Sequence, residues 1–312
     1  MYCEIDAVFV TYKPDLKILK NSLASIKDQI RDIYIVDNSD DVDARSGVVS
    51  VVEEFANIHL IQLGENVGIA KAQNIGIMKV LDMGAYLTLL SDQDTIYPEN
   101  FAKEMIANYG SILDKTKVAA IAPNFKEINK GGDAEGFFIL DGVTSVKSKS
   151  ESIREEVSQV IASGMLIVNS IVLDIGLMDE DLFIDWVDFE WCWRAKSKGY
   201  RIIGCRNVVI NHTLGDSAGA IGGRVYCLHS PRRNYYIVRN GISIALTKKY
   251  LANRVRVGIF LKSLRYVIGF TILSKQHTKN FVYCAVGLYH GLIGQLGSFE
   301  KSNTINVKKT GK

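Results

Sequence analysis

The chain has 312 residues, of which 47% are hydrophobic and 23% are charged. These values exclude a mostly disordered chain and allow one large core, or one core with a smaller appended unit. Five cysteines without a CxxC spacing predict neither a disulfide framework nor a zinc site. The N-terminus does not show a secretory signal pattern, and no apolar run approaches the length of a membrane span, so we expect a cytoplasmic protein.

The formal net charge of +3 conceals an asymmetry along the chain. Residues 224–312 contain 16 Lys and Arg and one acid, Glu300, for a net charge of +15. Residues 1–223 contain 21 basic and 33 acidic residues, for a net charge of −12. A basic end on an acidic body predicts a polyanionic partner for that end, either nucleic acid or anionic lipid.

The first hundred residues alternate between strand and helix patterns. Short apolar, β-rich runs predict strands at residues 5–11, 32–36, 58–63 and 86–90. Apolar residues at helical spacing predict helices at residues 16–30, 48–55 and 68–83. This alternation predicts a parallel sheet, in which ligands bind at the carboxyl ends of the strands.

The rest of the chain returns to strand patterns before it becomes helical. We expect strands at residues 118–122, within 136–168 and at 201–211. We expect loops at 126–134 and 147–158, and helices at 189–198, ended by Gly199, and over most of 232–298. The expected organisation is an α/β domain at residues 1–225, a basic helical region at 226–300 and a polar tail at 301–312.

Polar residues follow several of the predicted strands, among them Thr11, Asp37, Asn38 and Asn66. Each by itself is more typical of a turn or a helix cap, but the ordered series favours a ligand site.

The sharpest motif is the carboxylate pair of Asp92 and Asp94, directly after a buried strand. Two carboxylates at this spacing can bind one divalent cation, Mg²⁺ or Mn²⁺, which in turn binds substrate phosphates. His212 also follows a predicted strand and is either a further metal or diphosphate contact or a structural histidine.

The segment at residues 183–194 combines acids with three tryptophans. Acids among aromatic rings are candidates for a raised pKa, which suits a general base. Asp185 and Asp188 would share a helix face if the helix began before them, and Glu190 is a further candidate. The alternative is a core helix whose acids face solvent.

Taken in order, these motifs resemble family 2 glycosyltransferases of the GT-A fold, with the closest match to the bacterial rhamnosyltransferase-like branch. The resemblance covers roughly residues 5–240. The matching motifs are Val10-Thr11-Tyr12, Val36-Asp37-Asn38-Ser39, Asn66-Val67-Gly68-Ile69-Ala70, Asn74-Ile75-Gly76, Ser91-Asp92-Gln93-Asp94, Asp188-Phe189-Glu190-Trp191-Cys192-Trp193-Arg194, Arg233-Asn234-Tyr235-Tyr236 and Arg239-Asn240.

The resemblance implies a Rossmann-like, mostly parallel sheet flanked by helices, with a helical C-terminal region. It places Asp188 as the catalytic base, with Asp185 and Glu190 as rivals, although the family often has Glu-Asp where this chain has Val187-Asp188. It places Asp92, Asp94 and His212 at the metal and the diphosphate. The candidate nucleotide-sugar contacts are Thr11, Tyr12, Asp37, Asn38, Asn66, Gly68, Lys71, Asp92 and Gln93.

The implied reaction is transfer of a sugar with inversion, most simply L-rhamnose from dTDP-L-rhamnose, with a UDP-hexose as the alternative donor. The implied acceptor is a saccharide on a lipid diphosphate carrier, in O-antigen or capsule synthesis at the inner face of the bacterial membrane. The basic helices would then lie on the anionic membrane surface, or pack on the core or on a second copy of the chain.

Two other classes of protein remain as alternatives. A nucleotidyltransferase usually carries a Gly-rich basic loop after its first strand, but residues 11–15 contain no glycine. A non-catalytic basic nucleic-acid-binding protein would suit the +15 end, yet no nucleic-acid-binding motif is present, so nucleic acid is not the expected partner.

Overall fold

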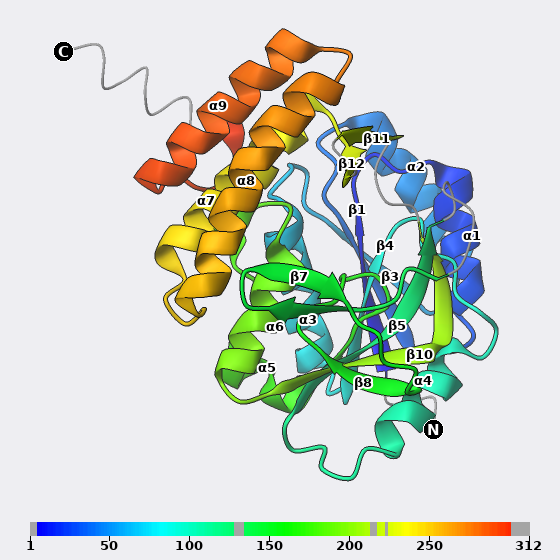
Figure 1. Cartoon of the computed structure of the whole chain (residues 1–312). Coiled ribbons are helices and arrows are strands. Elements are labelled where there is room, and N and C mark those ends of the chain that lie inside the picture. Colours follow the sequence, from blue (N-terminus) through cyan, green and yellow to red (C-terminus); the bar gives the residue numbers. More distant parts are fainter. Residues whose placement is uncertain (1–4, 128–133, 213–216, 222–223, 301–312) are drawn as a thin grey trace. The chain divides into compact units, whose positions relative to one another are not determined.

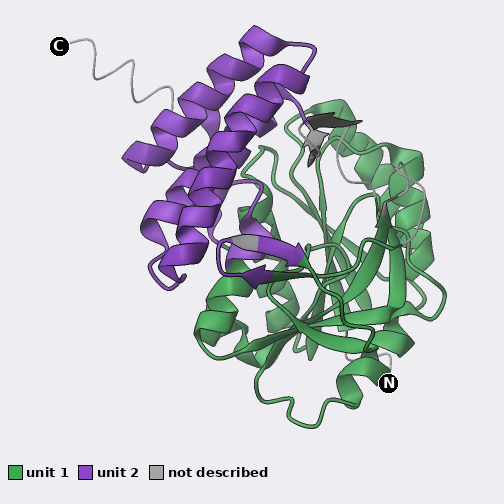
Figure 2. Cartoon of the chain, in the orientation of Figure 1, with its two compact units in different colours: residues 1–139, 147–178, 191–213 green, residues 140–146, 179–190, 214–312 purple. Residues whose placement is uncertain are grey.

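The computed structural model describes residues 5–127, 134–212, 217–221 and 224–300. The chain divides into two compact units, coloured separately in Figure 2. Unit 1 comprises residues 1–139, 147–178 and 191–213, and unit 2 comprises residues 140–146, 179–190 and 214–312. Unit 2 therefore includes residues 140–146, 179–190 and 214–225, which the sequence pattern assigned to the α/β domain. The predicted polar tail at 301–312 lies outside the described residues.

An eight-stranded sheet forms the centre of unit 1 (Figure 1). Its strand order is β3-β2-β1-β4-β9-β5-β10-β8. The pairs β1–β2, β2–β3, β1–β4 and β5–β10 are parallel, whereas β9 is antiparallel to β4 and β5, and β8 is antiparallel to β10. The predicted mixed, mostly parallel sheet is confirmed. The strands are β1 (Ile5–Thr11), β2 (Asp32–Asp37), β3 (Ile58–Gln62), β4 (Leu87–Asp92), β5 (Val118–Glu127), β8 (Arg154–Val157), β9 (Leu166–Val168) and β10 (Arg201–His212).

The two faces of β1 bury different helices, because successive side chains of a strand point in opposite directions. Ala7 and Phe9 share one core with α1 (Leu16–Ile26), α2 (Val42–Val52) and α4 (Phe101–Gly110). Val8 faces α3 (Ile69–Asp82) on the other side, where Gly76 allows close approach. Asn74 of α3 exchanges two hydrogen bonds with the backbone of Met178, 2.8 and 3.0 Å long, which fixes the chain after α5 (Asn169–Ile175).

Several boundaries differ from the sequence-based expectation. Helix α2 begins at Val42 rather than Val48, because Asp41 caps it by accepting a 2.9 Å hydrogen bond from Ala44 N. Helix α4 was not predicted, and β8 lies in a stretch expected to be a loop. Helix α6 (Val187–Ser197) ends before Gly199, whose φ of 83° confirms the predicted stop.

Unit 2 contains the predicted helical stretch as α7 (Pro231–Thr247), α8 (Asn253–Leu273) and α9 (His277–Ile293). Ile237, Val238 and Ile242 of α7 share an apolar cluster with Phe270 of α8 and Cys284 of α9. A strand pair, β11 (Ser217–Ile221) and β12 (Arg224–Leu228), precedes the helices, and β6 (Phe138–Asp141) pairs separately with β7 (Thr144–Lys147).

Gly76→Ala should destabilise the protein by about 1–3 kcal/mol, because the added Cβ would lie 2.2 Å from Val8 Cγ1 and force the packed α3 and β1 apart. Urea denaturation measures this change. Gly110→Ala is the matched control, since a Cβ at that helical position has no heavy atom within 4 Å, and it should be neutral or stabilising by up to about 1 kcal/mol. Equal effects of the two substitutions would contradict the tight packing of α3 on β1.

Candidate functional site

The carboxyl end of β2 carries a buried aspartate with one oxygen left for a ligand. Asp37 Oδ1 accepts hydrogen bonds from Thr11 Oγ1 at 3.0 Å, from Ser39 N at 3.2 Å and from Ser39 Oγ at 2.7 Å. Asp37 is fully buried, and its Oδ2 has no hydrogen-bond partner among the described residues. An acceptor without a partner in a buried place is costly unless a donor arrives, so Oδ2 is suited to receive an N–H or O–H of a ligand.

Asn38 and Asn66 bind each other and the backbone that enters α3. Asn38 Nδ2 donates to Asn66 Oδ1 at 3.1 Å, and Asn38 Oδ1 accepts from Val67 N at 2.8 Å. Asn66 Oδ1 also accepts from Gly68 N at 3.0 Å, and Gly68 has a φ of 87° that favours glycine. These two asparagines therefore hold the loop after β3, a role that the sequence pattern did not distinguish from direct ligand contact.

A hydrogen bond joins the loops that follow β1 and β4. Gln93 Oε1 accepts from Tyr12 N at 2.8 Å, which keeps the partly exposed Tyr12 beside the acidic loop. Lys71, the remaining candidate nucleotide-sugar contact, lies exposed in the first turn of α3. The structure thus brings Thr11, Asp37, Tyr12 and Gln93 to one edge of the sheet.

The predicted metal ligands also meet at this edge. His212 ends β10, and its ring lies between two carboxylates, with Nε2 3.6 Å from Asp92 Oδ2 and Nδ1 3.4 Å from Asp94 Oδ1. The histidine side chain is 6% exposed, whereas the two carboxylates are 33% and 30% exposed, so the acids face outward from a buried imidazole. Carboxylate oxygens with one imidazole nitrogen are a donor set that suits Mg²⁺ or Mn²⁺.

Within the described ranges, no three His, Cys, Asp or Glu side chains are already arranged around a common point as metal ligands. The three side chains nevertheless fit a divalent cation by the chemistry of their donor atoms and by their proximity.

Neighbours that the sequence analysis did not single out hold this cluster. Ser163 Oγ donates to Asp92 Oδ2 at 2.5 Å, and Thr95 Oγ1 lies 3.3 Å from His212 Nδ1. Tyr97 OH donates to Ser91 Oγ at 2.7 Å, and burial raises the pKa of Tyr97 far above its ordinary value, so the phenol stays a neutral donor. Ser163 lies more than seventy residues from Asp92 in the sequence, so no local pattern could have found it.

In unit 2, Asp188 lies in the first turn of α6 and is half-buried. Its Oδ1 accepts a 2.9 Å hydrogen bond from Phe189 N, as an acid at a helix N-terminus can. The two rival acids have structural partners of their own. Glu190 is fully buried and accepts a 2.6 Å hydrogen bond from Tyr250 OH, and Asp185 accepts three from Arg233 at 3.1–3.3 Å.

The expectation that Asp185 and Asp188 share a helix face fails, because α6 begins only at Val187. Asp185 precedes the helix with a φ of 64°, and Phe183 and Trp186 have similar values of 66° and 67°. Three non-glycine residues in the left-handed region within four positions make a strained approach to Asp188. The tryptophans at 186, 191 and 193 are buried, as their number predicted.

Arg239 and Asn240 of α7 hold this strained segment through its carbonyls. Asn240 Nδ2 lies within hydrogen-bond distance of the carbonyl oxygens of Leu182, Ile184 and Asp185, at 2.8, 2.7 and 3.1 Å. Arg239 Nη2 donates to Leu182 O at 2.9 Å, and its guanidinium lies over the ring of Tyr236. Burial lowers the pKa of Arg239, and the surrounding carbonyls and rings offset the lost hydration. This Arg-Asn pair is one of the motifs that resemble the family, but its sequence alone indicates no role for it.

Comparison with solved structures identifies the class of the fold. The GalNAc-T7 structure with UDP, GalNAc and Mn²⁺ superposes with a TM-score of 0.59 at 14% identity, covering 85% of this chain and 54% of that one, so this chain spans about half of GalNAc-T7. Mannosyltransferase PcManGT from Pyrobaculum calidifontis, in complex with GDP-Man and Mn²⁺, gives a TM-score of 0.52 at 13% identity, covering 99% and 80%. The fold is the GT-A fold of glycosyltransferases.

Sequence comparison narrows the class to a family. The profile described as Glycosyl transferase family 2 matches residues 6–140. The dTDP-rhamnosyl transferase RfbF of Shigella flexneri is 34% identical over 251 residues, which cover 77% of this chain and 79% of RfbF. The chain belongs to glycosyltransferase family 2, and the protein is a glycosyltransferase. This result does not favour the alternatives of a nucleotidyltransferase or a non-catalytic nucleic-acid-binding protein.

Asn240→Ala should lower the free energy of unfolding by about 2–4 kcal/mol, because buried and partly buried carbonyls lose a donor and a strained segment loses its support. Urea denaturation followed by tryptophan fluorescence measures this loss. Asn253→Ala, at an exposed position, is the control and should change the free energy of unfolding by less than about 0.5 kcal/mol. A similarly small loss at Asn240 would show that the segment at 182–186 keeps its conformation without it.

Proposed function

We propose that the protein transfers L-rhamnose from dTDP-L-rhamnose to a hydroxyl group of a saccharide acceptor, with inversion at the anomeric carbon. The similarity to RfbF, at 34% identity over most of both chains, supports this donor. The observation that carries the assignment of the site is the gathering of Asp37, Asp92, Asp94 and His212 at one edge of the sheet.

Asp37 is the proposed contact to the nucleotide base. Its buried Oδ2 has no partner within the described residues, and the N3–H of thymine or uracil is a donor that would satisfy it. Thr11 and Ser39 fix the other oxygen of the same carboxylate, so Oδ2 is held in place before a ligand arrives. Tyr12, Gln93 and Lys71 are the proposed further contacts to the donor.

Asp92 and Asp94, with His212, are the proposed ligands of a divalent cation. When bound, such a cation neutralises charge on the leaving diphosphate, which is worth several kcal/mol in comparable sites. Ser163 and Thr95 orient Asp92 and His212 for this role.

Asp188 is the proposed base. It accepts the proton of the acceptor hydroxyl while the hydroxyl oxygen forms a bond to the anomeric carbon and the bond from that carbon to the diphosphate breaks. The products are the glycoside and dTDP, and one displacement gives inversion. The motif at residues 188–194 resembles that of the family, and this supports Asp188 as the base. The rival acids Asp185 and Glu190 bind Arg233 and Tyr250.

The proposed acceptor is a saccharide on a lipid diphosphate carrier, in O-antigen or capsule synthesis. The proposed location is the inner face of the cell membrane, where the protein would be peripheral. The net charge of +15 over residues 224–312 supports an anionic surface as the partner of the helical end.

Asp188→Asn should lower the rate of rhamnose transfer by about 10²–10⁴-fold, because an amide cannot take the proton of the acceptor. Binding of dTDP should be unchanged, since the substitution keeps the size of the side chain. Transfer is measured as dTDP release in the presence of acceptor, and Asp181→Asn, an exposed acid of the same unit, is the control. If the Asp188→Asn variant kept full turnover, Asp188 would not be the base, and another residue would have to take the proton.

Among dTDP, UDP and GDP, we expect dTDP to raise the melting temperature most, and Mn²⁺ to increase that rise. A ligand at 100 times its Kd stabilises the native state by about 2.7 kcal/mol. Asp94→Asn should remove the part of the shift that depends on Mn²⁺, whereas Asp37→Asn should reduce the shift with and without the ion. A larger shift with UDP would support the UDP-hexose alternative, and no shift with any nucleotide would contradict the assigned site.

A further inference from the structure

The outer face of helix α8 exposes aliphatic side chains at helical spacing. Val257, Leu261, Ile268 and Ile272 are 53%, 48%, 61% and 51% exposed, although such residues are usually buried in the core of a helical unit. Their spacing of four, seven and four residues places them on one side of the helix. The inward side carries the buried Ile259, which belongs to the packed interior.

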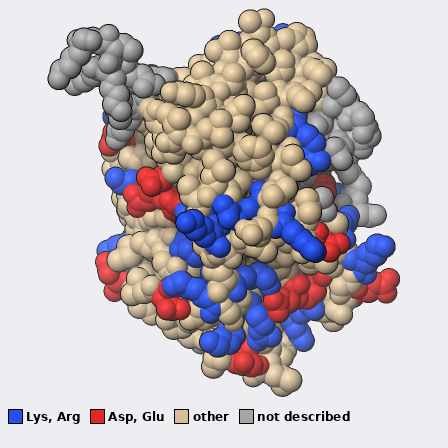
Figure 3. Space-filling model, turned by 60° about the vertical axis from the view of Figure 1, so that its left-hand side comes forward, with Lys and Arg blue, Asp and Glu red and all other residues tan. Residues whose placement is uncertain are grey.

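The neighbouring helix α9 has a second stripe of the same kind. Its exposed apolar residues are Phe281, Val282, Tyr289, Leu292 and Ile293, each at least 51% exposed. Its opposite side packs on α7, where Gly287 and Gly291 meet the carbonyls of Tyr235 and Arg239. Helices α8 and α9 run side by side as one hairpin, and the face of the molecule seen in Figure 3 has a broad area without charged side chains in its upper part. Together the two stripes form the apolar face of the hairpin.

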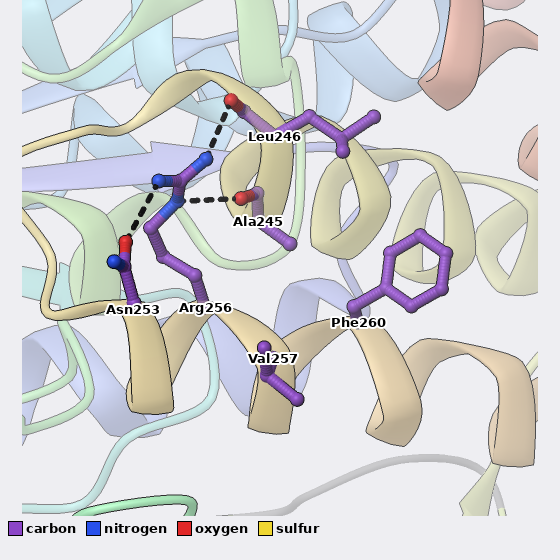
Figure 4. Close-up of a pocket in the computed structure, with 6 residues that line it drawn as sticks. All are labelled: Ala245, Leu246, Asn253, Arg256, Val257 and Phe260. Atoms are coloured by element: carbon purple, nitrogen blue, oxygen red, sulfur yellow. Dashed lines mark hydrogen bonds between the residues drawn. The ribbon is translucent and has the colours of Figure 1, made fainter.

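A hollow continues the apolar face at the junction of α7 and α8 (Figure 4). It is lined by Leu246, Val257 and Phe260, together with Ala245, Asn253 and Arg256. Arg256 donates to the carbonyls of Ala245 and Leu246 at 2.7 and 2.9 Å, so its charge caps the end of α7. The cations available to a partner are therefore others on the same hairpin.

All formal charges on the hairpin have one sign. Residues 224–299 contain 12 Lys and Arg and no Asp or Glu. Arg254 and Arg265 are exposed on α8, and Lys275 and Lys279 are exposed around the turn into α9. A second copy of the chain docked through this face would bring like charges together, whereas a surface of anionic lipid headgroups over an apolar interior matches both features.

No helix in the described part of the chain is long and apolar enough to cross a membrane. An apolar helix face with cationic flanks suits the plane of a membrane interface, and exposed aromatic residues such as Tyr289 and Phe281 are of the types that favour headgroup depth.

We infer that the apolar face of α8 and α9 is a docking surface for an anionic lipid bilayer, into which Leu261, Ile268 and Ile272 insert while Arg254, Arg265 and Lys275 contact the headgroups. The residues of this surface belong to unit 2, whereas the candidate nucleotide and metal contacts belong to unit 1, and the inference does not depend on which sugar is transferred.

Flotation of the full chain with vesicles tests the inference. The protein should float with phosphatidylcholine vesicles that contain one quarter phosphatidylglycerol at about 0.15 M ionic strength, and bind vesicles of phosphatidylcholine alone at least tenfold more weakly. The triple variant Arg254→Gln, Arg265→Gln, Lys275→Gln should bind the anionic vesicles on the order of 100-fold more weakly, since each cation near an anionic surface contributes about a factor of five. Leu261→Ser, Ile268→Ser, Ile272→Ser should lose at least tenfold at every lipid composition.

Matched controls use exposed residues of unit 1. Leu113→Ser with Leu173→Ser removes aliphatic side chains that are 105% and 72% exposed, and Lys17→Gln with Lys79→Gln and Lys103→Gln removes three exposed cations. Both sets should leave vesicle binding unchanged. The thermal shift with dTDP should be the same in all variants, so a failure of nucleotide binding is distinguished from a failure of docking.

Wild-type protein that does not float with anionic vesicles would overturn the inference, as would equal binding by the control and hairpin variants. A dimer in light scattering that Ile268→Ser, Ile272→Ser converts to a monomer, without a change in vesicle binding, would assign the face to a second copy of the chain instead.

Discussion

The parallel register of β1, β2 and β4 is the constraint on which the site of unit 1 depends. Thr11 pairs with Asp37 across β1 and β2, and Val10 pairs with Asp92 across β1 and β4, so three chain segments end at one level. Strand β9 is antiparallel to both of its neighbours, β4 and β5, so β5 runs in the same direction as β4. Strand β10 is parallel to β5, and its last residue, His212, therefore lies at the same edge of the sheet. A slip of one residue in any of these pairs would turn its polar end into the core.

In unit 2, a network of buried polar groups fixes the backbone that precedes the candidate base. The backbone before Asp188 has three non-glycine residues in the left-handed region. Without support from the surrounding structure, these residues would adopt more common backbone conformations. The adjacent side chains of Arg239 and Asn240 donate hydrogen bonds to carbonyl oxygens of this segment. Burying the polar side chains of Arg239 and Asn240 is unfavourable unless each donor forms a hydrogen bond. The network therefore specifies one conformation of the segment that leads into α6.

The surface of the helical hairpin follows a different rule from either buried network. Apolar side chains are found on both sides of α8, one side packed in a cluster with Phe270 and the other exposed with Ile268. Exposing these apolar side chains to water is unfavourable, so the face is expected to be covered by a partner. The uniform positive charge beside the face favours a partner with negative charge. Composition and exposure together therefore restrict the chemistry of the partner.

The sequence by itself determined the alternation of strands and helices, the acidic pair after β4, the family and the charge asymmetry, because these depend on local spacing and composition. It missed α4 and the early start of α2. Only the tertiary structure decided that Asp37 keeps one oxygen without a partner among the described residues, that Ser163 and His212 meet Asp92, and that Asp185 and Glu190 already have partners. Such outcomes depend on contacts between residues 26 to 120 positions apart, which the pairing of strands and helices fixes and no local pattern encodes.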